Sequence, residues 1–220
     1  MPKHLAIYLD GPMQSWGYMS KFDQRTSLAY PTKSGIIGML CAAMGIPKSD
    51  IGRLAEIADL EMSTYVLSPL NRINDFHTVG GGFDKKKHSQ NIVKKASGSI
   101  GNTVVTHREY LLNAKFAVIL SGKPDLLQQL ESALKNPLWG VWLGRKSCVP
   151  TVPISHGCHD STENALESAK SAYLKTYNKK CEVRRTVSEV AKFADGSDSL
   201  MDIPVNFAER KFSIRRVCIE

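Results

Sequence analysis

The sequence lacks any apolar run long enough to cross a membrane. Its longest apolar stretch, residues 36–46, is interrupted by Gly38 and Gly45 and is followed by Pro47. A membrane-spanning helix needs about 20 consecutive apolar residues. The N-terminus, Met-Pro-Lys-His, also lacks the apolar segment and the small-residue cleavage site of a signal peptide. These absences predict a cytoplasmic protein with no membrane partner.

Patterns typical of metal, disulfide and nucleotide sites are also missing. The five cysteines include no Cys-x-x-Cys pair, so free thiols are expected. The Gly-x-x-x-x-Gly-Lys pattern of P-loop proteins does not occur. His156, Cys158 and His159 are zinc-binding residue types, but their spacing matches no zinc template. We therefore expect neither a metal nor another cofactor.

Acidic residues are fewer than basic ones. The 220 residues include 29 Lys and Arg but 21 Asp and Glu, which gives a formal net charge of +8. Such a balance favours polyanionic partners, nucleic acid above all. Hydrophobic residues make up 42% of the chain, enough to bury a core.

Hydrophobic periodicity predicts an α+β domain over residues 1–150. The expected order is strand, helix, strand, a long insertion, strand and helix, with a further strand left open after it. This order is typical of a ferredoxin-like or RNA-recognition-motif-like fold. Residues 151–220 are predicted to form a C-terminal extension packed on the same domain. The predicted strands are 5–9, 61–67, 106–112, 116–120, 182–190 and 211–219, and the predicted helices are 36–44, 49–58, 124–135 and 165–174, with residues 12–30 as a loop.

The insertion, about residues 70–105, is glycine-rich and basic. Three glycines at 80–82 precede Lys85, Lys86 and Lys87. Lysines pair with phosphates without reading base sequence, and loops this long inside a domain are often functional. The charge run alone leaves two interpretations open, a phosphate-binding arm or a solvated loop.

Thr32, Lys33 and Ser34 precede a predicted helix and form a second candidate phosphate site. Free backbone N–H groups and the helix dipole favour an anion at such a position. An ordinary capped helix explains the same residues and is the interpretation that they favour when taken alone.

A third candidate is a short block in which a glycine precedes two cations and a hydroxyl, a pattern that lets backbone approach a phosphate. Two tryptophans at 139 and 142 stand just before it and have the residue type that stacks on bases, although burial in a core is the commoner fate of a tryptophan. The block consists of Gly144, Arg145, Lys146 and Ser147.

Metal-independent RNA cleavage needs a base for the 2′-hydroxyl proton and an acid for the leaving oxygen. His77, His88, His107, Tyr110 and Lys115 are residues of suitable type. The sequence alone does not bring them together, and it shows no carboxylate constellation for a two-metal nuclease.

Several blocks together resemble the CasD family of the type I-E CRISPR surveillance complex, Cascade. The two most specific N-terminal blocks are Gly-Pro-Met-Gln-Ser-Trp-Gly at 11–17 and Tyr-Pro-Thr-Lys-Ser-Gly-Ile-Ile-Gly at 30–38. The remaining matches occur in the family's order at residues 75–79, 108–116, 143–148, 204, 207, 208 and 210.

The resemblance implies an RNA-recognition-motif-like domain whose insertion is a long β-hairpin, called the thumb. It implies a noncatalytic subunit that binds the 5′ handle of CRISPR RNA (crRNA) and caps the backbone filament. Its protein partners would be the backbone subunit and the large subunit that reads the protospacer-adjacent motif, with target DNA met through the complex. A metal-independent endoribonuclease, as in type I-C relatives, is the alternative, and a pure protein adaptor is a third.

From the resemblance and the charge pattern together we expect a set of RNA-contacting residues. It comprises Gln14, Ser15, Trp16, Arg25, Thr32, Lys33, Ser34, His77, Lys85, Lys86, Lys87, Arg108, Gly144, Arg145, Lys146 and Ser147.

Overall fold

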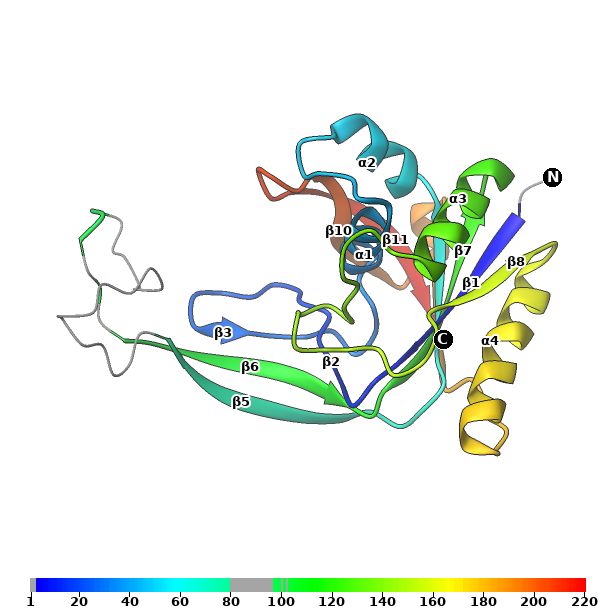
Figure 1. The fold of residues 1–220 in the computed structure, drawn as a ribbon, viewed down its shortest axis with the longest axis horizontal. Helices are drawn as coiled ribbons and strands as arrows, with labels where there is room; N and C mark the ends of the chain where they lie inside the picture. Colours follow the sequence, from blue (N-terminus) through cyan, green and yellow to red (C-terminus); the bar gives the residue numbers. More distant parts are fainter. Residues whose placement is uncertain (1–2, 80–96, 100, 102) are drawn as a thin grey trace.

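A computed structural model describes residues 3–79, 97–99, 101 and 103–220 (Figure 1). The predicted lysines Lys85, Lys86 and Lys87 lie outside the described residues. The elements are β1 (Lys3–Asp10), β2 (Met13–Gln14), β3 (Gln24–Arg25), α1 (Lys33–Met44), α2 (Ile51–Ala58), β4 (Glu61–Val66), β5 (Asn71–Val79), β6 (Val104–Leu112), β7 (Lys115–Gly122), α3 (Pro124–Lys135), β8 (Ser155–His159), α4 (Thr162–Tyr177), β9 (Arg185–Glu189), η1 (Phe193–Asp195), β10 (Asp198–Asn206) and β11 (Lys211–Ile219).

The main sheet has the strand order β10-β11-β9-β4-β7-β1-β8. Each neighbouring pair along this order is antiparallel. Helix α1 lies in the connection from β1 to β4, and α3 lies in the connection from β7 to β8. In the sheet, β7 stands between β1 and β4, and β1 stands between β7 and β8, so each connection passes over one strand of the other pair. Strands after residue 150 pair directly with strands before it: β8 pairs with β1, and β9 pairs with β4.

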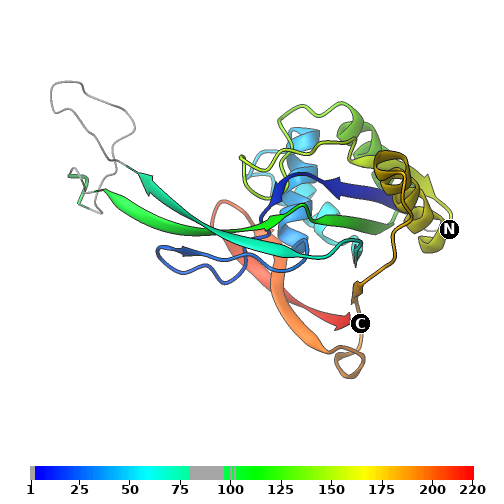
Figure 2. The ribbon, with the colours of Figure 1, turned by 90° about the horizontal axis from the view of Figure 1, so that it is seen from below.

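Both faces of the central strands are covered by helices. Leu5, Ile7 and Leu9 of β1 belong to the same buried cluster as the apolar residues of α1 and α3. Tyr8 packs with α4 on the opposite face (Figure 2). Alternate residues of β1 are therefore apolar toward both helix layers, as expected for a strand with no solvent-facing side.

Small residues let α4 lie close to the sheet. Ala165, Ala169 and Ala172 are buried against β1 and β7. Their spacing places them on one side of the helix. The segment predicted as helix 165–174 is confirmed and extends to Thr162–Tyr177.

Strands β5 and β6 form a ribbon that projects from the body of the molecule (Figures 1 and 2). They pair from Asn71↔Leu112 to Val79↔Val104. The other edge of β6 pairs with β2 and β3, so residues 12–30, predicted as a loop, contain two short strands. Asn113 has a φ of +50°, a conformation asparagine tolerates, and it turns the chain from β6 into β7.

Two strands of the C-terminal part were not predicted from the sequence. These are β8 and β10, whereas the predicted strands 182–190 and 211–219 correspond to β9 and β11. Within the residues that the structure describes, no helix is both long and apolar enough to span a membrane.

A buried cluster of ion pairs joins the start of α1 to the C-terminal strands. Asp202 accepts hydrogen bonds from Arg215 Nε at 2.6 Å and from the backbone N–H of Lys33 at 2.7 Å. Lys33 Nζ lies 3.0 Å from the Glu189 carboxylate, which Arg215 also contacts at 3.2 Å. Lys33, Asp202 and Arg215 are each at most 5% exposed. Each charge has lost its hydration by burial, and the ion pairs and hydrogen bonds to its partners compensate for that loss.

We expect Asp202→Asn to lower the free energy of unfolding by about 3 kcal/mol, because it leaves Arg215 buried without its full counter-charge. Urea denaturation at neutral pH measures this as a shifted midpoint with an unchanged slope. The matched control is Glu209→Gln, which removes a carboxylate from the exposed ion pair with Lys211 and should change stability by less than about 0.5 kcal/mol. Equal losses of stability in the two variants would show that the buried ion pair between Asp202 and Arg215 contributes no more than an exposed one.

Candidate nucleic-acid interface

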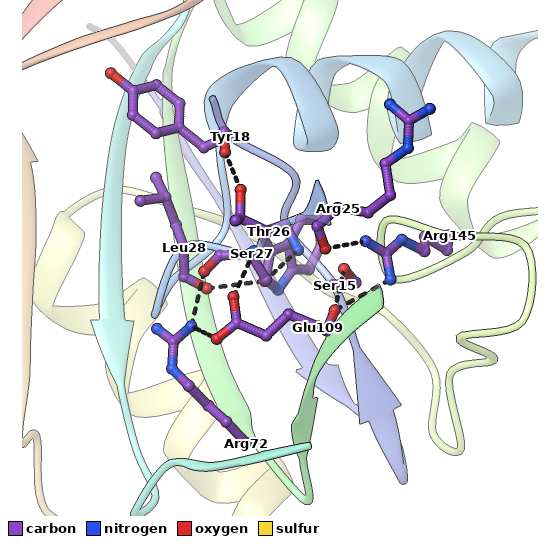
Figure 3. A network of polar contacts seen from close by, with 10 residues as sticks. Ser15, Tyr18, Arg25, Thr26, Ser27, Leu28, Arg72, Glu109 and Arg145 are labelled. Atoms are coloured by element: carbon purple, nitrogen blue, oxygen red, sulfur yellow. Dashed lines mark hydrogen bonds and ion pairs between the residues drawn. The ribbon is translucent and has the colours of Figure 1, made fainter. Parts of the chain in front are cut away.

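Three segments far apart in the sequence meet at the base of the ribbon (Figure 3). They are residues 15–28, the facing residues of β5 and β6, and the loop 144–147. The contacts that hold them together converge on Glu109 of β6.

Glu109 uses both its carboxylate and its backbone carbonyl. The carboxylate accepts the backbone N–H of Ser27 at 2.9 Å and pairs with Arg72, which also donates to the Ser27 carbonyl at 2.8 Å. The carbonyl accepts Ser15 Oγ at 2.9 Å and Arg145 Nη1 at 3.1 Å. Partial burial raises the pKa of Glu109, but the Ser27 N–H and the Arg72 guanidinium outweigh it and hold that pKa below its ordinary value.

Arg145 fixes the loop 144–147 onto the ribbon. Besides the Glu109 carbonyl, its guanidinium donates to the Arg25 carbonyl at 2.8 Å and lies 4.7 Å from the centre of the Tyr110 ring. Both terminal nitrogens of Arg145, which was predicted to contact RNA, are used in these internal contacts.

Gln14 and Trp16 are enclosed by the protein. Gln14 Nε2 donates to the carbonyls of Leu9 and Ala114 at 3.2 and 2.8 Å, and its Oε1 accepts the Trp16 indole N–H at 3.2 Å. A Cβ at Gly35 would come within 2.9 Å of the Trp16 ring, so the indole packs on the start of α1. Gln14 and Trp16 are at most 1% exposed in this conformation, so their polar groups are used within the protein.

The start of α1 is occupied by protein groups. Thr32 Oγ1 caps the helix by accepting the backbone N–H of Gly35 at 3.2 Å. The anion at this helix start is the Asp202 carboxylate, and Lys33 is buried in the ion cluster. The structure shows the capped helix, and in this conformation Thr32 and Lys33 are each 2% exposed and make contacts within the protein. Ser34 is half-buried beside them.

Gly144 is required for packing. Its φ is +92°, and a Cβ there would lie 1.8 Å from the Ser15 carbonyl oxygen. Ser15 is itself buried. The glycine therefore allows the loop to lie directly against Ser15. Lys146 and Ser147, at the tip of the loop, are exposed.

Two grooves flank the ribbon. The first groove, of about 350 Å³, is lined by Gln24, Arg25, Thr26, Arg72, Ile73, Asn74, His107 and Glu109. The second groove, of about 380 Å³, is lined by Met13, Ile73, Asp75, His77, Arg108, Tyr110 and Ser147. The predicted residues Arg25, His77, Arg108 and Ser147 therefore lie in grooves, on opposite sides of one ribbon.

The structure distributes the described candidate cleavage residues, with His77 and Tyr110 together in the second groove and His107 in the first. His77 lines the second groove and His107 the first, because the two side chains project from opposite faces of the ribbon. Lys115 lies 3.8 Å from buried Asp10 and over the ring of Tyr177. His88 is outside the described residues. No phosphodiester in one groove would meet both described histidines.

The described residues contain no group of three or more His, Cys, Asp or Glu side chains arranged to hold a metal ion. The ring Nε2 atoms of His156 and His159 contact the backbone carbonyls of Pro153 and His156 at 2.9 and 3.0 Å.

Sequence reasoning missed Arg72 and Glu109. Glu109 directly follows Arg108, but nothing in the sequence indicated that its carboxylate faces Ser27. Arg72 lies at the edge of the insertion, where no periodicity marked a strand.

Comparisons with known proteins cover nearly the whole chain. A family model described as "CRISPR-associated protein (Cas_Cas5)" matches residues 4–218. The "CRISPR system Cascade subunit CasD" of Escherichia coli (strain K12) is 27% identical over 228 residues, which cover 97% of this chain and 96% of that protein.

Solved structures agree with this match. A chain of a "CRISPR RNA-guided surveillance complex" is similar with a TM-score of 0.75 and 28% identity, over 99% of this chain and 89% of that one. A "Crystal structure of Cas protein" is similar with a TM-score of 0.67 and 30% identity, over 99% and 93%. The mixed α/β fold with antiparallel sheets is thus shared with these proteins.

Replacing Glu109 by Gln should destabilise the protein by about 1 kcal/mol at neutral pH, since Arg72 loses a partly exposed ionic partner. A carboxylate whose pKa is depressed on folding stabilises above its unfolded pKa, about 4.3, and that stabilisation is lost as pH falls through the lower folded pKa. The difference between variant and parent should therefore shrink from pH 7 to pH 3.

Urea unfolding at both pH values measures the effect of Glu109→Gln. The control is Glu56→Gln, which removes an exposed carboxylate 3.9 Å from Arg53. If the free energy of unfolding differs between Glu109→Gln and the parent by the same amount at both pH values, the charge of the carboxylate does not cause the destabilisation.

Proposed function

Because residues 4–218 match its family model, the chain belongs to the Cas5 family of CRISPR-associated proteins, and we propose that it is a subunit of a type I-E Cascade complex in antiviral defence. In this proposal it binds the 5′ handle of crRNA and caps the backbone filament. The observation that carries the proposal is the pair of grooves at the ribbon base, which bring Arg25, Arg72 and Arg108 to the surface around a braced scaffold.

The proposed fold class is ferredoxin-like. Strands β4, β7, β1 and β8 with crossover helices α1 and α3 have the order of that fold. RNA-recognition motifs of this class bind bases on the sheet face opposite the crossover helices. Here α4 covers that face, so the RNA has to bind beside the sheet, at the ribbon. We propose that the ribbon is the base of the thumb.

The proposed RNA contacts differ from the sequence-based set. Direct contact is assigned to exposed or half-buried groove residues and to the loop tip, and positioning to Gln14, Ser15, Trp16 and Arg145. The direct contacts are Arg25, Arg72, Asn74, His77, Arg108, Lys146 and Ser147, and Lys85, Lys86 and Lys87 remain predicted from sequence.

We propose a noncatalytic role in the cytoplasm. Two observations support it, because general acid and base must act on one phosphodiester. His77 and His107 line different grooves. Tyr110 shares the second groove with His77 but is only 6% exposed and lies beneath the Arg145 guanidinium. The proposed protein partners are the backbone subunit and the large subunit that reads the protospacer-adjacent motif, with target DNA bound through the complex.

One gel tests binding against cleavage. Labelled crRNA with its 5′ handle is mixed with the full chain in EDTA, with and without partner subunits. A shifted, intact band that requires the handle supports the proposal. A shortened product that disappears in His77→Ala or His107→Ala would make the protein an endoribonuclease.

Arg25→Ala and Arg108→Ala should each weaken handle binding, and each phosphate contact removed should flatten the dependence of log affinity on log salt by about 0.7. Lys123→Ala is the control, since this exposed lysine follows β7 at the end of that strand opposite to the turn from β6. Filter binding across 50–300 mM salt measures the slopes. Slopes equal to the parent's in both arginine variants would exclude these residues as phosphate contacts.

Substituting Lys85, Lys86 and Lys87 together by alanine tests the insertion. If these lysines contact phosphates, the triple variant binds handle RNA more weakly and with a flatter salt dependence than the parent. An unchanged slope would assign the insertion a role other than phosphate binding.

A further inference from the structure

A pocket of about 570 Å³ lies beside the second groove. It is bordered by the C-terminal half of α1, by residues 139–142 and by Phe207. The loop 144–147 separates the two hollows, because Lys146 lines the pocket while the next residue, Ser147, lines the second groove. A strand leaving the groove needs to cross only this loop to enter the pocket.

Two indoles stand exposed at this pocket. Trp139 and Trp142 retain 47% and 36% of their surface exposed, so neither has the core position that most tryptophans occupy. Lys48 and Lys146 also line the pocket, and none of the described residues that line it carries a carboxylate. The pocket therefore offers aromatic faces and positive charge together.

The indoles are carried by ordered backbone. The N–H groups of Leu138 and Trp139 donate to the carbonyls of Ala43 and Ala42 at 2.9 and 3.1 Å, which satisfies the end of α1. A Cβ on Gly140 would come within 2.7 Å of the Trp142 ring, so this glycine lets the indole lie against the chain. The aromatic surface is thus formed before any ligand arrives.

We infer that this pocket receives an unstacked base of the RNA strand held in the second groove, stacked on Trp139 or Trp142. The inference rests on the proposed function and adds a base-binding subsite to it. The position next to the groove, across the loop 144–147, and the cationic, carboxylate-free lining favour RNA over a protein side chain as the occupant. Because the rest of the lining is largely apolar, as at Ile46 and Leu54, the subsite should accept any of the four bases.

Trp139→Ala and Trp142→Ala are compared with the parent chain for binding to a labelled single-stranded RNA of the handle sequence. The variant that removes the stacking ring should lose about 5- to 150-fold in affinity. The salt slope should stay that of the parent, since no phosphate contact is removed, whereas Lys146→Ala should flatten it. Trp142→Phe or Trp139→Phe should restore most of the affinity.

The matched control is Phe193→Ala. This ring is 75% exposed and lies in η1, outside the pocket, so its loss should leave RNA affinity unchanged. Urea unfolding of every variant separates lost binding from lost folding.

An abasic scan identifies the base. RNAs lacking one base at a time are bound to the parent and to the affected tryptophan variant. At one position, removing the base should weaken binding to the parent but not further weaken binding to the variant, because both changes delete the same contact. Additive losses at every position would overturn the inference.

Two outcomes separate the subsite from the proposed function. If the parent binds handle RNA and all tryptophan variants bind it equally well, the subsite is refuted and the handle-binding role stands. If those variants also fail to assemble with the partner subunits, the pocket is a protein interface. If neither the parent chain nor its complex binds the handle, the proposed function fails, and the subsite with it.

Discussion

The geometry of the interface depends on the hydrogen bonds made by Glu109. Its carboxylate and carbonyl hold Ser27, Arg72, Ser15 and Arg145, which come from three separate segments. Because β6 continues through the turn at Asn113 into β7, this brace is attached directly to the centre of the main sheet. The exposed cations of the grooves are thereby held by the core, although the ribbon itself projects away from it. Preformed geometry of this kind reduces the ordering cost of binding.

The elements that sequence predicted are those with a simple apolar pattern. Strand β1 is a short apolar run that is buried on both faces, and helix α3 places Leu127, Leu130 and Leu134 on one buried face. Strand β5 was missed because eight of its nine residues are exposed, which leaves no alternation to detect. Strand β10 was missed because Asp202 and Pro204 occupy inward positions beside Leu200. A carboxylate faces inward there only because Arg215 meets it from the next strand.

The candidate site was predictable in its location and less so in its individual contacts. Sequence blocks identified the segments that meet at the ribbon base, and Arg25 and Arg108 do line its grooves. Within those blocks, the sequence does not distinguish a polar residue that would contact RNA from one that forms hydrogen bonds within the protein. Gln14 and Lys33 are of the second kind, since their partners are carbonyls and carboxylates of the same chain. Distinguishing the two kinds required the positions of partners up to 169 residues away in the sequence.

Covering the sheet with α4 has a consequence for how RNA is recognised. A bare sheet face offers bases a flat platform, but here that face packs on Ala165, Ala169 and Ala172. Aromatic surface for stacking is instead presented at the edge of the body by Trp139 and Trp142, where the end of α1 supports it. The proposed phosphate-binding cations lie one loop away, in the grooves of the ribbon. In the proposed binding mode, backbone contact and base stacking are thus separated by the loop 144–147, which begins with the positive φ of Gly144.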